Sequence, residues 1–164
     1  MQVIEAFPTV ENVANLQLNA DGSLRHLLTL KGLDKGMLTE ILDDAQRFVT
    51  QPGEPSARSN TLAGRTVANL FFEPSTRTRA SFDLAGKRLG ADVLNLDVNT
   101  SSRKKGESIL DTIYTLQAMQ ADVMVIRDAS SGVPAYIARH VNDHVCILNA
   151  GEAEVSHPTQ GLLD

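Results

Sequence analysis

The sequence predicts an α/β fold in which a parallel sheet is flanked by helices. Between residues 66 and 148, short apolar strand-like segments alternate with single segments of helical periodicity. Strands joined by single helices form parallel sheets with right-handed crossovers. Polar and basic residues gather directly after the strand-like segments, at the edge where ligands bind to such sheets. Both observations favour an α/β domain with a site at the carboxyl ends of its strands.

The first predicted helix spans residues 34–50. Apolar residues from Leu38 to Val49 recur at the three- and four-residue spacing of one helix face, and Asp34 is suited to cap the amino end. A loop over residues 51–60, which contains two prolines and a glycine, separates this helix from the alternating part of the chain.

The elements that follow are short, and Gly90 and Gly132 mark two of the turns between them. Runs of apolar residues indicate the strands, and longer segments with polar residues on one face indicate the helices. The predicted strands are 66–72, 92–98, 123–126 and 145–148, and the predicted helices are 76–89, 107–119 and 134–141.

Composition limits the class of protein. The chain has 164 residues, of which 42% are hydrophobic and 21% charged, as is typical of a soluble globular protein. Residues 1–24 lack periodicity and are predicted to be an N-terminal extension, while residues 25–164 are long enough to form one domain with a core. The net charge of −5 argues against nucleic acid as a partner. We read no signal peptide and no membrane span, and therefore expect a cytoplasmic protein.

The segment at residues 71–79, FFEPSTRTR, ends a predicted strand, turns at Pro74 and begins a predicted helix. With Ser75 or Thr76 near the N-cap, the unpaired first-turn amides face outward, and the helix dipole favours an anion there by about 0.3–1 kcal/mol. The Arg77 guanidinium would add charge-assisted hydrogen bonds worth about 1.5–3 kcal/mol each. The alternative is a capped helix with two arginines on its solvated face.

Three further segments that follow predicted strands carry basic or polar side chains. Residues 99–108, NTSSRKKGES, could form a basic turn before a helix. Arg127 could pair with Asp128 in an exposed ion pair worth about 0–1 kcal/mol. His157 precedes a proline and could be an ordinary loop residue. Each has such a structural explanation when taken alone, but the predicted topology places all of them at one edge of the sheet.

Signals for a metal or a nucleotide cofactor are weak. The sequence contains neither a GxxxxGK[ST] phosphate loop nor a GxGxxG turn. His140 and His144 are four residues apart, but a helix end and a strand start separate them and no third ligand is evident. The single cysteine, Cys146, lies in an apolar run where a buried thiol is expected. We therefore expect no metal and no cofactor.

The motifs together resemble a known family. The run FFEPSTRTRASFDLA at residues 71–85 resembles the carbamoyl-phosphate motif of the aspartate and ornithine carbamoyltransferases. Residues 101–107 are similar to the SxxxKGE segment of the aspartate enzymes, and HPTQ at residues 157–160 is similar to a family signature. Two positions depart from the pattern: Asp128 stands where some relatives have His-Pro, and Pro74 where other residues precede STRTR.

The resemblance implies transfer of the carbamoyl group from carbamoyl phosphate to an amine, with release of phosphate. Thr78, Arg127 and His157 are then the candidates to stabilise the negative oxygen of the tetrahedral transition state. Ser101 and Lys105 are expected to reach the site from a neighbouring subunit of a homotrimer. The residues expected to bind carbamoyl phosphate within one chain are Ser75, Thr76, Arg77, Thr78, Arg127, His157 and Gln160.

L-Aspartate is the expected acceptor, and N-carbamoyl-L-aspartate, an intermediate of pyrimidine biosynthesis, the expected product. Two features favour aspartate over ornithine: the KKGES segment, and HPTQ where ornithine enzymes usually carry HPCQ. Lys105 could also contact the acceptor carboxylate. Family catalytic chains are longer and bind aspartate with a second domain. We therefore expect this chain to lack that C-terminal domain, to bind carbamoyl phosphate and to be inactive alone.

Other functions remain open at this point. The chain could be the corresponding domain of an ornithine-type enzyme, or a non-catalytic domain that binds phosphate or mediates oligomerisation. The predicted extension at residues 1–24 resembles that of bacterial forms that assemble with dihydroorotase-like chains.

Overall fold

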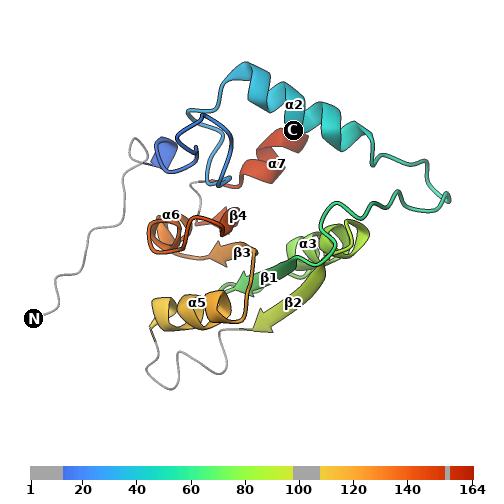
Figure 1. Cartoon of the computed structure of the whole chain (residues 1–164). Helices are drawn as coiled ribbons and strands as arrows, with labels where there is room; N and C mark the ends of the chain where they lie inside the picture. The colour runs from blue at the N-terminus through green and yellow to red at the C-terminus, as the bar shows by residue number, and fades with distance from the viewer. Residues whose placement is uncertain (1–12, 98–107, 154–155) are drawn as a thin grey trace, which may run out of the picture.

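The structure, a computed structural model, describes residues 13–97, 108–153 and 156–164 (Figure 1). Its strands are β1 (Thr66–Phe71), β2 (Asp92–Asp97), β3 (Val123–Asp128) and β4 (Cys146–Glu152). These strands form a parallel sheet in the order β2-β1-β3-β4. The predicted fold class is thus confirmed. Because β1, β3 and β4 are neighbours, the segments that follow them meet at one edge.

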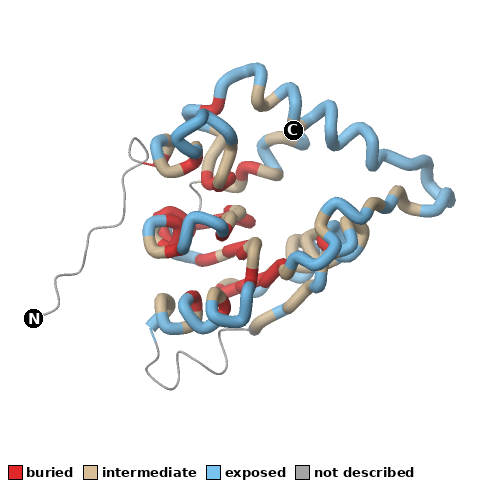
Figure 2. Tube along the Cα trace, viewed as in Figure 1, coloured by how far each residue is buried: buried red, intermediate tan, exposed pale blue. Residues whose placement is uncertain are grey.

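Helices cover both faces of the sheet. Helices α5 (Ile109–Ala118) and α6 (Val133–Ala138) bury Ile113 and Ile137 in the main core on one face. Helix α3 (Thr76–Arg88) covers the other face over β1 and β2, where Phe82 packs on a smaller buried cluster. Helix α7 (Pro158–Leu163) contacts β4. Figure 2 shows the buried residues concentrated in and around the sheet.

Helix α2 (Lys35–Gln46) begins where predicted and ends earlier than residue 50. The Asp34 carboxylate accepts a hydrogen bond of 2.8 Å from the backbone N–H of Met37, as an N-cap does. Beyond Gln46 the chain tightens, because Phe48 N–H bonds to the carbonyl three residues back. Phe48 and Val49 are 42% and 64% exposed, so no buried contact extends the helix through them.

Strands β3 and β4 extend further than predicted, to Asp128 and Glu152 instead of residues 126 and 148. The backbone N–H of Phe72 bonds to the carbonyl of Arg127 at 2.8 Å, and Asp128 pairs with Glu152 across the ladder. The ends of both strands carry polar residues, so the apolar runs that predict the strands stop before the strands do. Arg127 therefore belongs to β3, near its carboxyl end, and does not follow the strand as predicted.

The described part of the predicted N-terminal extension packs on the sheet. Val13 belongs to the main core, and Gln17 is fully buried. The side-chain oxygen of Gln17 accepts hydrogen bonds of 2.8 Å from the N–H groups of both Leu28 and Thr29. Residues 13–24 are thus tied to the segment that follows them.

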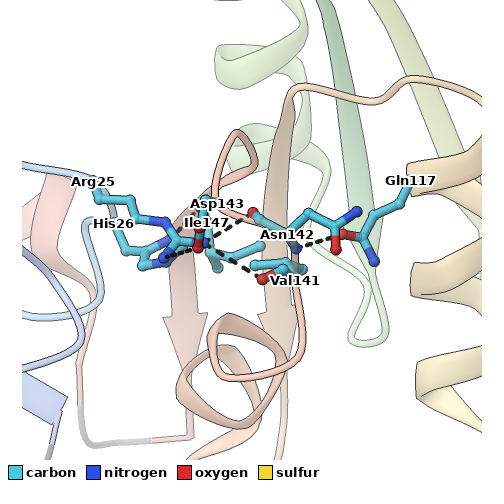
Figure 3. Close-up of polar contacts among 7 residues, drawn as sticks. All are labelled: Arg25, His26, Gln117, Val141, Asn142, Asp143 and Ile147. Atoms are coloured by element: carbon cyan, nitrogen blue, oxygen red, sulfur yellow. Dashed lines mark hydrogen bonds and ion pairs between the residues drawn. The ribbon is translucent and has the colours of Figure 1, made fainter. Parts of the chain in front are cut away.

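That segment is fastened to β4 and to the turn before it (Figure 3). The ring Nδ1 of buried His26 accepts the backbone N–H of Ile147 at 2.9 Å. The guanidinium of Arg25 donates to the carbonyl of Asn142 at 2.9 Å, and the N–H of Asn142 donates to the side chain of Gln117 at 2.7 Å. The network connects the N-terminal part of the chain to α5 through one turn.

Replacing Ser108 with alanine is expected to destabilise the fold by about 1 kcal/mol, because α5 begins with a capping box. Ser108 Oγ accepts the N–H of Asp111 at 3.2 Å, and the Asp111 carboxylate accepts the N–H of Ser108 at 3.0 Å. Urea unfolding measures the loss. Ser131→Ala, at another exposed serine, is the control, and equal midpoints for the two variants would contradict the role of the cap.

Candidate functional site

The carboxyl ends of β1, β3 and β4 bring three of the predicted segments together. β1 leads into the turn before α3, β3 ends with Arg127 and Asp128, and β4 leads into the loop that carries His157. The segment after β2, with Ser101 and Lys105, lies outside the described residues. The predicted roles of those two residues therefore stay predictions.

The amino end of α3 is open, as the predicted anion-binding turn requires. Ser75, one of the two residues predicted to lie near the N-cap, is the N-cap and has an extended backbone, but its side chain does not cap an amide of the first turn. Instead Ser75 Oγ donates to Thr78 Oγ1 at 2.9 Å, which links the two hydroxyls. The first turn contains no acidic residue, so its N–H groups and dipole face outward without a negative partner from the turn itself.

Thr76 and Arg77 are exposed in this first turn. The main chain of Arg77 is held because its carbonyl accepts a bond of 3.0 Å from Ser81 Oγ. No ion pair with another described residue fixes its guanidinium. An exposed, planar guanidinium beside free helical amides is suited to bind one edge of a phosphate group.

Arg127 is held on two sides. One guanidinium nitrogen, Nη1, donates to the carbonyl of Ala150 at 3.0 Å, and the other, Nη2, pairs with Glu73 Oε2 at 3.2 Å. The ion pair predicted as the alternative, with Asp128, is replaced by one with Glu73, which directly precedes the anion-binding turn. The buried Nε of Arg127 has no hydrogen-bond partner among the described residues. A buried donor without a partner is costly, so the two contacts of the Nη groups must hold the guanidinium in place against this cost.

His157 is the N-cap residue of α7 and lies close to Arg127. A Cβ atom placed on Gly151 would overlap Nη1 of Arg127 and lie 3.2 Å from Cδ2 of His157, so both side chains approach the same backbone atom. Burial, and next the positive charge of Arg127, lower the pKa of His157. The imidazole is therefore neutral at pH 7 and donates through only one of its nitrogens. Its Nδ1 lies 3.3 Å from Thr159 Oγ1.

Gln160, in the first turn of α7, is not brought to Arg127 by a direct contact. Its side-chain nitrogen bonds to Asp164 Oδ1 at 3.3 Å, and the residue is exposed. Its predicted contact with the carbamoyl group stays a prediction.

The end of β4 contains residues that the sequence reading does not single out. The side chains of Asn149 and Glu152 are buried and bonded to each other at 3.1 Å, and Gly151 lies between them. Asn149 to Glu152 continue an apolar strand with a glycine between two polar residues, and this pattern is the signal that could have marked them.

Other features of the described residues do not form a competing site. Within those residues, no three His, Cys, Asp or Glu side chains are grouped to hold a metal ion, and no helix is long and apolar enough to cross a membrane. A polar depression lies at the opposite edge of the sheet, beside Thr66, Asp122 and His144. Both carboxylate oxygens of Asp122 are already bonded, to the Arg65 side chain and to the Thr66 N–H, each at 2.8 Å.

Comparisons with known proteins identify the family to which this domain is similar. Residues 25–164 match the family described as aspartate/ornithine carbamoyltransferase, carbamoyl-P binding domain. The catalytic subunit of M. jannaschii aspartate transcarbamoylase is 39% identical with a TM-score of 0.73, over 86% of this chain and 45% of that chain. Trypanosoma cruzi aspartate transcarbamoylase in complex with N-(phosphonacetyl)-L-aspartic acid is 36% identical with a TM-score of 0.72, over 91% and 45%.

The same Trypanosoma cruzi enzyme in complex with carbamoyl phosphate and aspartate is 36% identical with a TM-score of 0.70, over 97% of this chain and 46% of that chain. The match thus spans less than half of the length of each of these structures. The predicted resemblance is confirmed by both kinds of comparison. The chain belongs to the aspartate/ornithine carbamoyltransferase family, of which it matches the carbamoyl-phosphate-binding domain.

Proposed function

We propose that this chain binds carbamoyl phosphate at the amino end of α3 and forms the carbamoyl-phosphate half of an aspartate carbamoyltransferase. The observation that carries the proposal is the meeting of two anion-binding features at one edge of the sheet. The open turn at Ser75 begins two residues after Glu73, and Glu73 pairs with Arg127 at 3.2 Å. A ligand with a phosphate and a carbonyl oxygen could therefore contact the turn and Arg127 together.

The phosphate group is assigned to the first turn of α3. Its backbone N–H groups and dipole favour negative charge, and the hydroxyl of Thr76 can donate to a phosphate oxygen. The hydroxyl of Ser75 can do the same once it turns from Thr78 Oγ1 to the phosphate. Arg77 adds a planar pair of donors and a full positive charge. Because this charge partly neutralises the departing phosphate, the same contacts serve binding and leaving-group stabilisation.

The carbamoyl carbonyl is assigned to Thr78, Arg127 and His157. The amine nitrogen of the acceptor attacks the carbonyl carbon, so a C–N bond forms and the carbonyl oxygen becomes negative. The bond from carbon to the phosphate oxygen then breaks, its electron pair leaves with the phosphate, and the phosphate accepts the amine proton. Donors aimed at the negative oxygen lower the barrier, and losing one typically costs about 100- to 1000-fold in rate.

The remaining parts of the assignment rest on sequence similarity to the family. Gln160, or its backbone, would orient the carbamoyl nitrogen, and Ser101 and Lys105 would enter from a neighbouring subunit of a homotrimer. A cytoplasmic location and assembly with dihydroorotase-like chains belong to the same proposal. The support for these points is the similarity of residues 101–107 and 157–160, and of the extension at 1–24, to family segments.

Turnover is proposed to need an aspartate-binding domain in addition to residues 25–164. The relatives above are more than twice as long as the part that matches. Helix α2 also has no buried residue, although Leu42 and other apolar residues recur along it, and Leu163 of α7 is 81% exposed. Uncovered apolar positions on two helices support the presence of a further domain surface in the active enzyme.

Arg77→Ala is expected to weaken binding of carbamoyl phosphate at least tenfold, because one charge-assisted hydrogen bond is worth about 1.5–3 kcal/mol. Isothermal titration of the chain with carbamoyl phosphate measures the dissociation constant. Arg139→Ala, at the exposed end of α6, removes the same charge away from the site and is expected to bind normally.

The same titration distinguishes the other functions. Saturable binding of carbamoyl phosphate, with much weaker binding of phosphate esters that lack the carbamoyl group, supports the proposal. An equal response to any phosphate ester indicates a general phosphate-binding module, and no binding at all indicates a domain that only retains the fold. An ornithine-type enzyme would be recognised when the complete enzyme carbamoylates ornithine in preference to aspartate.

A further inference from the structure

The end of β4 makes an unusual bend beside the proposed site. Gly151 has a φ of +117°, a conformation that side-chain-bearing residues rarely adopt, and it is buried. The carbonyl of the preceding Ala150 accepts Nη1 of Arg127 at 3.0 Å. On the other side of the bend the chain turns back, because Glu152 N–H bonds to the Ser156 carbonyl at 3.0 Å, and His157 follows. The bend therefore sets the positions of both Arg127 and His157.

Asn149 fixes the bend from within the strand. Its side-chain oxygen accepts the N–H of Gly151 at 2.9 Å. Its side-chain nitrogen donates to the carbonyl of Leu28 at 2.9 Å and to Glu152 Oε1 at 3.1 Å. A fully buried amide with three bonds leaves little freedom for the backbone that it holds.

Glu152 fixes the bend from the other end. Its second carboxylate oxygen, Oε2, accepts the N–H of Gly132 at 2.6 Å, at the amino end of α6. The residue is only 8% exposed, and burial raises the pKa of its carboxyl group. A buried acid is costly, and a negative charge at an edge that binds an anion opposes binding. The two hydrogen bonds of its carboxylate, from Gly132 and Asn149, account for a glutamate at this position.

Besides its positive φ, Gly151 must lack a side chain for a steric reason. A Cβ atom there would overlap Nη1 of Arg127 and lie within 3.2 Å of both Cζ of Arg127 and Cδ2 of His157. The side chains of Arg127 and His157 thus pack against the bare backbone of Gly151. No larger residue can occupy this position while both keep their places.

We propose that Asn149, Gly151 and Glu152 form a positioning unit that holds Arg127 and His157 in the geometry needed to bind the carbamoyl group. This inference rests on the proposed function for its ligand, but not for the contacts themselves. None of these three residues is assigned to touch the ligand. They act through the Arg127 guanidinium and the His157 ring.

Gly151→Ala is the direct test, with Gly64→Ala as the matched control. Gly64 also has a positive φ, of +74°, but a Cβ atom on it would meet nothing within 4 Å. Both changes impose backbone strain, and only the first overlaps Arg127. Binding of carbamoyl phosphate, measured by titration, is expected to weaken about tenfold or more in Gly151→Ala and to stay within about twofold in Gly64→Ala.

A double-mutant cycle separates overlap with the guanidinium from general damage. Arg127→Lys removes Nη1, the atom that the new methyl group would overlap, while lysine Nζ takes about the position of Cζ. The effect of Gly151→Ala on binding should therefore largely disappear in the Arg127→Lys background. If the two effects simply add, the proposed overlap is wrong.

Glu152→Gln provides a second route should Gly151→Ala fail to fold. The side chain keeps its shape, but whichever way the amide is turned, its NH2 group faces either Asn149 Nδ2 or the Gly132 N–H, both of which are donors. In NMR titrations of the unliganded chain, we expect a higher pKa of His157 than in the native chain, because Arg127 moves away from it. Unchanged His157 titration in both Gly151→Ala and Glu152→Gln would overturn the inference.

Different results would contradict the proposed function and the proposed positioning role. If the native chain does not bind carbamoyl phosphate, the proposed function is wrong, while the His157 titrations still report on the positioning unit. If the native chain binds and both variants bind and titrate like it, only the positioning role is wrong.

Discussion

Replacing Arg127 with alanine is expected to weaken binding of carbamoyl phosphate by about 100-fold or more. The guanidinium is half-buried and already oriented by Ala150 and Glu73, so little further ordering is needed when a ligand binds. Loss of charge-assisted bonds worth about 1.5–3 kcal/mol each accounts for the expected effect. Isothermal titration of the native and variant chains measures it.

Two companion variants make this result interpretable. Arg127→Lys keeps the charge but not the planar fork, so binding should be intermediate. Glu73→Gln removes the ion pair but keeps the guanidinium, and the weaker competition for Arg127 should leave binding unchanged or slightly tighter. Circular dichroism and thermal unfolding show whether each variant is folded. A folded Arg127→Ala chain that binds carbamoyl phosphate within about threefold of the native chain would refute the assignment.

Local sequence patterns predict much of the fold, including the start of α3 at the turn proposed to bind an anion. Asp34 and Ser75 occupy the N-cap positions expected of them, because the choice of cap residue and the helical period that follows are local properties. The order of strands and helices is likewise visible in the alternation of apolar runs. Predicting these features does not require knowing which distant segments of the chain are in contact.

The parts that could not be predicted depend on register between distant segments. The pairing of Arg127 with Glu73 follows from the alignment of β1 with β3, in which Phe71 lies opposite Arg127. The bend at Gly151 depends on a bond from Glu152 to the start of α6. The sequence shows the residue types but not these partners. The anion-binding role predicted for Arg77 follows from local chemistry, whereas the roles predicted for Arg127, His157 and Gln160 come from resemblance to the family.

The packing of the N-terminal part of the chain is also not predicted by local sequence patterns. Residues before Arg25 have no periodicity, yet Gln17 is fully buried and bonds to two amides of the next segment. One buried polar side chain anchors this segment in place of a periodic apolar face, so a search for hydrophobic periodicity does not detect it. His26, which the sequence reading leaves without a role, is equally buried for its hydrogen bond to Ile147.

Lowering the pH from 7 to 4 is expected to destabilise the fold by up to about 3 kcal/mol through His26 alone. His26 is 1% exposed and its Nδ1 must stay unprotonated to accept the Ile147 N–H. Burial, and next the charge of Arg25, lower the pKa of His26 to about 4. In the unfolded chain the group takes up its proton near pH 6.5, so the unfolded state binds more protons between those values. Stability is therefore lost as the pH falls through that window, at about 1.4 kcal/mol per unit.

Urea unfolding of the native chain and of His26→Asn, at pH 7 and pH 4, isolates this contribution. Asparagine can place an oxygen near the position of Nδ1 and accept the same N–H, but it does not titrate. Comparison within each chain is needed because other groups also respond to pH. Glu152, whose pKa burial raises, becomes protonated more readily in the folded chain and so opposes the loss. The native chain should lose about 3 kcal/mol more than His26→Asn between the two pH values, and a parallel decline of both would show that His26 does not control acid stability.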